Sequence, residues 1–211
     1  MKPWLIVPAK PFTAAKSRLA AILSPASRAE LGARLLERTV QVARATVAFE
    51  QIVVVSRDAA ALQLAAGLGV YALAEAGSEL NAAVAQACRF AVDSGATRAL
   101  ILPADLPLLA VEDLDLLCAA ADTASTIVAT PSRDGGTNAL LLPLPAPIAF
   151  AYGTDSFRQH VRQAVAQALP LRVVETPSLR IDLDSPADVI ELAEGITGPL
   201  HDLLAGIAHP Q

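Results

Sequence analysis

Two acidic segments of the sequence place carboxylates beside apolar runs, where a metal ion could be bound. Asp105 lies in ALILPADLPLLA, at the end of an apolar run that is typical of a buried strand. Asp182 and Asp184 lie two apart in IDLDSPADV, so both side chains project from the same face of an extended segment. Proteins commonly bind Mg²⁺ through one or two carboxylates together with substrate phosphates. These three acids are the candidate metal ligands, and Asp184 is favoured over Asp182 as the partner of Asp105.

The loop PAKPFTAAKSRLA, after the first apolar run, concentrates positive charge. Lysine occurs only at positions 2, 10 and 16, and every other basic residue is an arginine. Lys10, Lys16 and Arg18 all fall in this one loop. Ammonium groups supply compact charge for phosphate oxygens and a guanidinium supplies a fork of donors. The loop lacks the Gly-x-x-x-x-Gly-Lys pattern of a P-loop, so it predicts a polyanion site of another kind.

Two further segments combine glycines with small hydroxyl side chains. In PSRDGGTNALLL a double-glycine turn precedes Thr137 at the start of an apolar run. In AYGTDSFRQH, Gly153 and Ser156 precede a helical pattern that begins near Phe157. Backbone N–H groups at a helix N-terminus, with hydroxyls beside them, suit a phosphate or a carboxylate. Both segments are candidate anion cradles.

Ordinary structural roles are the alternative for each of these residues. Asp105 could be a turn or capping residue, although the next helix start lies later, at VEDLDLL. Asp182 and Asp184 could be solvated acids at a strand end, and the basic loop a solvated turn. A site is favoured because all of these groups lie at the ends of predicted strands, and ligands bind in the crevice at the carboxyl edge of such sheets.

The elements that would position these groups alternate between short apolar runs and longer helical patterns. Continuous apolarity in the early runs indicates strands buried on both faces, as in a mostly parallel sheet covered by helices. Strands are predicted at WLIVP, QIVVVS, VYALA, ALILP, STIVATP, NALLLP, LRVVE and LRIDLD. Helices are predicted over 28–46, 59–68, 80–92, 111–120, 156–169 and 186–194, with capping boxes at Ser27 and Ser185. The prediction is a single-domain, Rossmann-like α/β fold over residues 1–195, followed by a short helical tail over 196–211.

Composition excludes several classes of protein. The chain has 211 residues, 54% of them hydrophobic, and a net charge of −5, which argues against binding to nucleic acid or to an anionic membrane. Cys88 and Cys118 are predicted to be free thiols, and the start of the chain has no signal-peptide pattern, so a cytoplasmic location is expected. The three histidines show no metal or catalytic spacing, and no histidine chemistry is predicted.

Taken in order, six motifs resemble the 2-phospho-L-lactate guanylyltransferase family, which makes the GDP-linked precursor of the deazaflavin coenzyme F-420. They span about Val7 to Glu194 and are VPAKPFTAAKSRLA, LNAAVAQA, LPADLPLL, GGTNALLLP, GTDSF and DLDSPADV. The resemblance implies a nucleotidyltransferase fold and the transfer of GMP from GTP to a small phospho-acid. It also implies GTP and the phospho-acid as partners, with a downstream transferase of the pathway as a candidate protein partner.

The same resemblance implies a role for each candidate residue. Asp105 would bind Mg²⁺ with Asp184 or Asp182. The loop of Lys10, Lys16 and Arg18 would take the triphosphate, and Asn81 would face the nucleoside. The phospho-acid would be held by Thr137, Gly153 and Ser156.

One turn departs from the family pattern. Members usually have Gly-Pro-Gly-Ser-Phe where this chain has Gly-Thr-Asp-Ser-Phe, so Asp155 adds a negative charge beside the expected acceptor. Members use phosphoenolpyruvate, 2-phospho-L-lactate or 3-phosphoglycerate, and phosphoenolpyruvate is the favoured acceptor here. A cytidylyltransferase, a sugar-phosphate nucleotidyltransferase and a non-catalytic nucleotide-binding subunit remain the alternatives.

Overall fold

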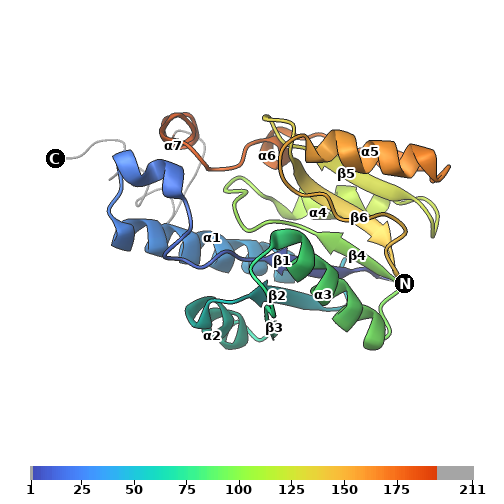
Figure 1. The fold of residues 1–211 in the computed structure, drawn as a ribbon, viewed down its shortest axis with the longest axis horizontal. Helices are drawn as coiled ribbons and strands as arrows, with labels where there is room; N and C mark the ends of the chain where they lie inside the picture. Colours follow the sequence, from blue (N-terminus) through green and yellow to red (C-terminus); the bar gives the residue numbers. More distant parts are fainter. Residues whose placement is uncertain (1, 194–211) are drawn as a thin grey trace.

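A computed structural model describes residues 2–193 as one seven-stranded sheet with helices on both faces (Figure 1). The strand order is β3-β2-β1-β4-β6-β5-β7, and β6 alone among these strands runs antiparallel to its neighbours. The strands are β1 (Trp4–Pro8), β2 (Ile52–Ser56), β3 (Tyr71–Ala74), β4 (Arg98–Ile101), β5 (Ile127–Pro131), β6 (Thr137–Pro143) and β7 (Leu171–Val173). The predicted α/β class with a mostly parallel mixed sheet is confirmed.

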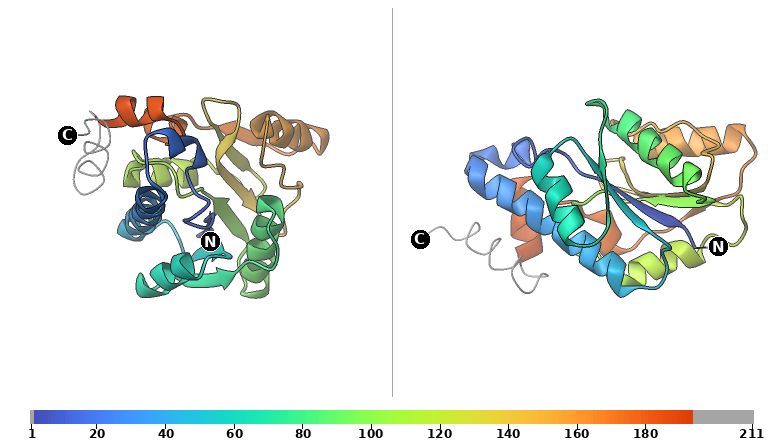
Figure 2. Two further views of the ribbon diagram at one scale, coloured as in Figure 1. Left: turned by 60° about the vertical axis from the view of Figure 1, so that its left-hand side comes forward. Right: turned by 90° about the horizontal axis from the view of Figure 1, so that it is seen from below.

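The core forms two apolar layers, one on each face of the sheet. Successive side chains of a strand alternate between the faces, so Leu5 and Val7 join one layer and Ile6 the other. The first layer is covered by α1 (Pro25–Ala45), α2 (Ala59–Gly67), α4 (Val111–Ala119) and α6 (Pro177–Arg180), and the second by α3 (Leu80–Asp93) and α5 (Ser156–Ala166). Figure 2 shows α3 and α5 together on one side of the sheet. A third cluster joins η1 (Ser17–Ala21), α1 and α7 (Pro186–Ala193).

Two local predictions were wrong. LRIDLD was predicted as a strand, but Pro177–Arg180 form a short helix, and residues 181–185 lie outside every helix and strand. Thr176 caps that helix by accepting from the N–H of Leu179, with Pro177 at its first position, and this start signal outweighed the apolar alternation. The cap of α1 is Ser24 and not Ser27, since Pro25 opens the helix and the N–H of Ser27 donates to the Ser24 hydroxyl.

The order of the strands brings the candidate loops to one edge of the sheet. The chain passes from β1 to β2 on one side, whereas β4 lies on the other side of β1, so a topological switch point lies between β1 and β4. Lys16 follows β1 and Asp105 follows β4. Because β6 is antiparallel to β4, its first residue, Thr137, lies at the same edge.

The tail over 196–211 and the predicted domain boundary at 195 lie outside the described residues. Cys88 and Cys118 are free thiols, as predicted, and burial raises the pKa of Cys88 to about 12. Among the helices described, none combines the length and the apolarity that crossing a membrane requires.

Candidate active site

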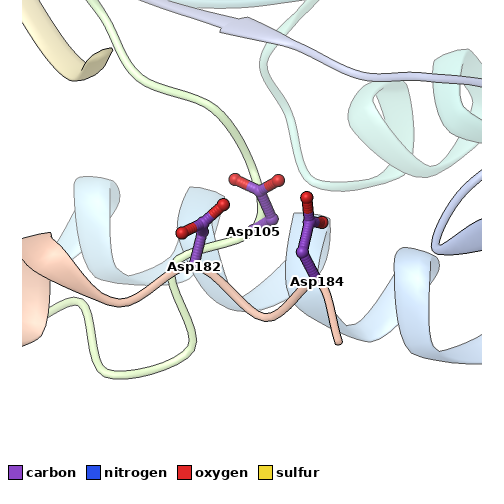
Figure 3. Close-up of side chains that lie close together, drawn as sticks. All are labelled: Asp105, Asp182 and Asp184. Carbon is purple, nitrogen blue, oxygen red and sulfur yellow. The ribbon is translucent and has the colours of Figure 1, made fainter. Parts of the chain in front are cut away.

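Three carboxylates meet at the carboxyl edge of the sheet. Asp105 lies in the loop after β4, and Asp182 and Asp184 lie between α6 and α7; oxygen atoms of the three groups are all within 4.8 Å of one another. Figure 3 shows the three side chains rising on the same side of the two segments. The structure therefore brings together all three of the acids that the sequence offered as metal ligands.

Leu183 sets the geometry of the two acids that flank it. Its side chain is fully buried in the cluster of η1, α1 and α7, so the neighbouring side chains of Asp182 and Asp184 must project the other way. Its backbone N–H donates to the backbone carbonyl of Asp105 at 3.0 Å, which ties the two acidic segments directly. Asp182 and Asp184 thus share a face, as the sequence predicted, although residues 181–185 do not form a strand.

The ammonium group of Lys16 lies between two of the carboxylates. Its Nζ is 3.2 Å from Oδ2 of Asp105 and 3.2 Å from Oδ1 of Asp184, and only 7% of the side chain is exposed. Burial by itself would lower the pKa of Lys16, but the two carboxylates outweigh burial and the pKa is raised. Arg18 is a more exposed partner, with Nη1 3.7 Å from Oδ2 of Asp184.

The loop that carries Lys16 is anchored at several points. The N–H of Phe12 donates to Oδ2 of Asp58 at 2.6 Å, while Oδ1 of Asp58 caps α2 through the N–H of Ala60. The Phe12 ring packs on Gly32 of α1, where a Cβ would lie only 3.2 Å from the ring. Lys16 itself has a φ of 53°, a left-handed conformation that is uncommon for a residue with a side chain. These anchors hold the ammonium group at the acids.

The acids have the chemistry of a divalent cation site. Oδ1 of Asp105 is buried and has no hydrogen-bond partner among residues 2–193. A buried oxygen of this kind is costly unless a donor or a cation reaches it. Burial, followed by the charges of Asp105, Asp184 and Asp134, raises the pKa of Asp182 to about 6. The three carboxylates can thus carry more negative charge than Lys16 and Arg18 neutralise. Carboxylate oxygens are the ligands that Mg²⁺ prefers.

Asp113, which sequence reasoning did not select, holds the acidic segment in place from α4. Its Oδ1 accepts from the hydroxyls of Thr176 and Ser178, each at 2.7 Å, and its Oδ2 accepts from the N–H of Ala110 at 2.9 Å. The side chain is buried, so without it these three donors would lose their hydrogen-bond acceptor. The buried amide of Asn138 adds a second anchor by donating to the carbonyl of Leu179 at 2.9 Å.

We expect Asp113→Ala to lower the free energy of unfolding by about 2–4 kcal/mol, because three donors lose their acceptor and α4 loses its cap. Urea denaturation measures the effect. Glu112→Ala, at the exposed neighbouring position, is the control and should change stability by less than about 0.5 kcal/mol. Equal effects of the two substitutions would contradict the anchoring role.

The predicted acceptor cradle contains a hydrogen-bonded group of three side chains. Oγ1 of Thr137 is 3.0 Å from Oγ of Ser156 and 3.0 Å from Nδ1 of His160, and all three residues are buried. Gly153, with a φ of +135°, and Asp155, with a φ of +57°, shape the turn before α5. His160 was missed because no histidine pattern was present; its only signal is that it follows Ser156 by four residues, on the same face of a helix.

Two residues predicted to contact GTP, Lys10 and Asn81, form no ion pair or hydrogen bond with the three acids in the described part of the chain. Lys10 is exposed, and none of the carboxylates in residues 2–193 lies within ion-pair distance of it. Both polar atoms of the Asn81 amide are occupied by the backbone of Tyr152, with Nδ2 donating to the carbonyl at 3.1 Å and Oδ1 accepting from the N–H at 2.7 Å. In this structure Asn81 therefore ties α3 to the loop before α5.

Comparison with known proteins agrees with this architecture. The family described as "Guanylyl transferase CofC like" matches residues 3–198. The phosphoenolpyruvate guanylyltransferase of Rubrobacter xylanophilus is 39% identical over 193 residues, covering 91% of this chain and 94% of that protein. The 2-phospho-L-lactate guanylyltransferase of Methanothermobacter thermautotrophicus is 34% identical over 194 residues, covering 91% and 84%.

A solved structure extends the likeness to the fold. A nucleotidyl transferase from Methanothermobacter superposes with a TM-score of 0.67 at 16% identity, covering 92% of this chain and 97% of that one. At that identity the likeness supports the fold alone, and it agrees with the sheet and the strand-end site described above. Matched along nearly its whole length, and 39% and 34% identical to two guanylyltransferases, the chain belongs to the CofC-like guanylyl transferase family.

Proposed function

We propose that this protein transfers GMP from GTP to the phosphate group of a small phospho-acid and releases pyrophosphate. The observation that carries the proposal is the seating of the Lys16 ammonium group between Asp105 and Asp184, with Asp182 beside them, at the switch point of the sheet. Cationic and metal-binding groups side by side suit a triphosphate. The family membership supports guanylyl transfer over other nucleotidyl transfers.

The proposed reaction is a displacement at the α-phosphorus of GTP. A phosphate oxygen of the acceptor forms a bond to that phosphorus, and the bond from phosphorus to the bridging oxygen of the leaving pyrophosphate breaks. A phosphate monoester is largely a dianion near neutral pH, so the attacking oxygen needs no base to deprotonate it. Lys16 and Arg18 would hold the triphosphate and the leaving pyrophosphate, which leaves alignment and charge neutralisation as the main tasks of the protein.

Mg²⁺ is the proposed cofactor, held by Asp105 together with Asp182 and Asp184. When bound, it would neutralise phosphate charge and polarise the phosphoryl oxygens. The unpartnered Oδ1 of Asp105 and the raised pKa of Asp182 both fit a cation at this point. Lys10 and Asn81 complete the proposed GTP site, with the Asn81 amide first released from Tyr152.

The proposed acceptor is phosphoenolpyruvate, bound by Thr137, Gly153 and Ser156. Relatives at 39% and 40% identity are named for phosphoenolpyruvate, whereas a relative named for 2-phospho-L-lactate is 34% identical. Production of a GDP-linked acid would place the enzyme at the guanylylation step of coenzyme F-420 biosynthesis.

Asp155 poses no obstacle to an anionic acceptor. Its side chain is 51% exposed and lies 4.0 Å from Nη1 of Arg158, so its charge is directed to solvent. Its φ of +57° also explains why family members have glycine here, since this region favours glycine and tolerates aspartate. We expect Asp155→Gly to change the KM for the acceptor by less than about twofold, because a solvated charge is well screened. A tenfold fall in that KM in steady-state assays would show instead that the carboxylate faces the acceptor.

One assay separates the proposed function from its alternatives. The protein is incubated with Mg²⁺, with GTP, CTP or UTP, and with phosphoenolpyruvate, 2-phospho-L-lactate or 3-phosphoglycerate, and pyrophosphate release and product mass are measured. Turnover with GTP and phosphoenolpyruvate supports the proposal. Preference for CTP or UTP, or for a sugar phosphate, would assign another nucleotidyl transfer. An absence of pyrophosphate in every combination would favour a non-catalytic nucleotide-binding subunit.

A further inference from the structure

We propose that His160 is a positioning residue that leaves one hydroxyl hydrogen of the Thr137–Ser156 pair free to be donated to the anionic acceptor. The inference rests on the proposed function, because it takes Thr137 and Ser156 as contacts of the phospho-acid. His160 itself would touch neither substrate. It would act by fixing which atom donates in the hydrogen bonds that join His160, Thr137 and Ser156.

The proton of the imidazole ring is on Nδ1. The backbone N–H of Ala151 donates to Nε2 of His160 at 3.0 Å, so Nε2 offers a lone pair and carries no proton. The ring is fully buried, and burial lowers the pKa of His160 to about 4, so it is neutral near pH 7. A neutral ring without a proton on Nε2 must carry it on Nδ1. That N–H points to Oγ1 of Thr137, 3.0 Å away, which therefore accepts.

With Nδ1 of His160 as a donor, one of the two hydroxyl hydrogens of Thr137 and Ser156 stays unused. Thr137 and Ser156 together have two hydroxyl hydrogens, and one of them makes the 3.0 Å bond between the two oxygens. Because His160 donates and does not accept, the second hydrogen has no partner within the group of three. If His160 accepted at Nδ1 instead, that hydrogen would be used on the ring, and the pair would have no donor left for an anion. The tautomer of a buried histidine thus decides whether the pair offers a donor.

The pair is placed where an acceptor beside the metal-binding acids would need it. Thr137 directly follows the turn over 132–136, and that turn is tied to α5 by the N–H of Phe157, which donates to the carbonyl of Gly135 at 3.3 Å. Asn138, the residue after Thr137, donates to the carbonyl of Leu179 at 2.9 Å, three residues before Asp182, so the start of β6 lies beside the segment that carries two of the acids. Thr137 and Ser156 are 6% and 1% exposed, so little water is present to compete for a hydrogen bond with their free hydroxyl.

Two substitutions separate the two contacts of the ring. His160→Asn keeps a donor near the position of Nδ1 and loses the acceptor for Ala151, whereas His160→Gln keeps an acceptor near Nε2 and loses the donor to Thr137. By the same count His160→Gln leaves one hydroxyl hydrogen free, but no donor then fixes Oγ1 of Thr137, so that hydrogen is no longer held toward the acceptor. We therefore expect the KM for phosphoenolpyruvate to rise about fivefold or more, as the loss of one orienting hydrogen bond would cause, with the KM for GTP unchanged. His160→Asn should retain most of the wild-type affinity for the acceptor, even though its melting temperature falls.

Gln163→Ala is the matched control. Gln163 lies on the same helix and bonds the same loop, through the N–H and the carbonyl of Ala149 at 2.8 and 3.1 Å, but it does not touch the hydroxyl pair. It should loosen the loop and leave the KM for the acceptor within about twofold of wild type, because no donor to the acceptor is lost. If Gln163→Ala raised that KM as much as His160→Gln, the loop and not the donor would be responsible, and the inference would fail.

Nuclear magnetic resonance of histidine labelled with ¹⁵N tests the tautomer without reference to activity. Comparison of the spectra of wild type and His160→Asn assigns the ring. The expected result is a proton on Nδ1 at neutral pH; a proton on Nε2, or a charged ring, would overturn the inference. Failure of the proposed function is distinguishable, because it requires that wild type releases no pyrophosphate with any phospho-acid. An active wild type whose KM is the same after His160→Gln would refute this inference alone.

Discussion

Asp105→Asn is expected to lower kcat by about 10³-fold or more while the protein stays folded. An amide is a poor ligand for Mg²⁺, and the metal contributes several kcal/mol to stabilisation of the transition state in reactions of this type. The fold should survive because the backbone carbonyl of Asp105, and not its side chain, accepts from Leu183. The side-chain oxygen that remains can still accept from Lys16.

The measurement pairs steady-state turnover at several Mg²⁺ concentrations with thermal melting. Asp115→Asn is the matched control and should retain wild-type turnover, because Asp115 is an exposed acid on α4 that accepts from the hydroxyl of Thr46 and does not belong to the acid cluster. In the same assay Asp184→Asn should raise the Mg²⁺ requirement more than Asp182→Asn does. Turnover of Asp105→Asn within a few-fold of wild type at saturating Mg²⁺ would show that Asp105 does not bind the metal.

The strands could be predicted because their signals are local. β1 has the same bounds as the predicted WLIVP, since a run of apolar residues between turn residues has few other ways to bury itself. Residues 177–180 were missed because LRIDLD alternates as a strand does, while the competing signal, a capping threonine followed by proline, lies just before it. A local cap thus outweighed a short apolar pattern.

The acids of the site could be predicted for a related reason. The rule that ligands bind at the carboxyl ends of the strands needs only the predicted fold class, and the observed strand order brings Lys16 and Asp105 together. The roles of Asp113 and His160 could not be predicted, because each depends on contacts between residues far apart in the sequence. Asn81 illustrates the same limit, since nothing in LNAAVAQA indicates that its amide binds the backbone of Tyr152.

Lys16→Met should have opposite effects on turnover and on metal affinity. With one preorganised charge lost from the triphosphate site, kcat/KM for GTP is expected to fall by about 10²-fold or more. In the nucleotide-free protein, however, the ammonium group lies 3.2 Å from both Asp105 and Asp184 and so repels a divalent cation at the same carboxylates. Its removal should tighten binding of Mn²⁺ by about tenfold or more, because two like charges a few ångströms apart in a partly buried site cost at least that much.

Electron paramagnetic resonance of free Mn²⁺ measures the affinity without nucleotide, and steady-state kinetics measures kcat/KM. Lys10→Met removes an exposed lysine of the same loop that has no ion pair within the described part of the chain, and it should not tighten Mn²⁺ binding. Lys16→Arg should restore only part of the turnover, since a planar fork does not replace a compact charge. Weaker or unchanged Mn²⁺ binding in Lys16→Met would mean that the metal does not compete with the ammonium group. Tighter binding would show that the ammonium group and the metal compete for the carboxylates of Asp105 and Asp184.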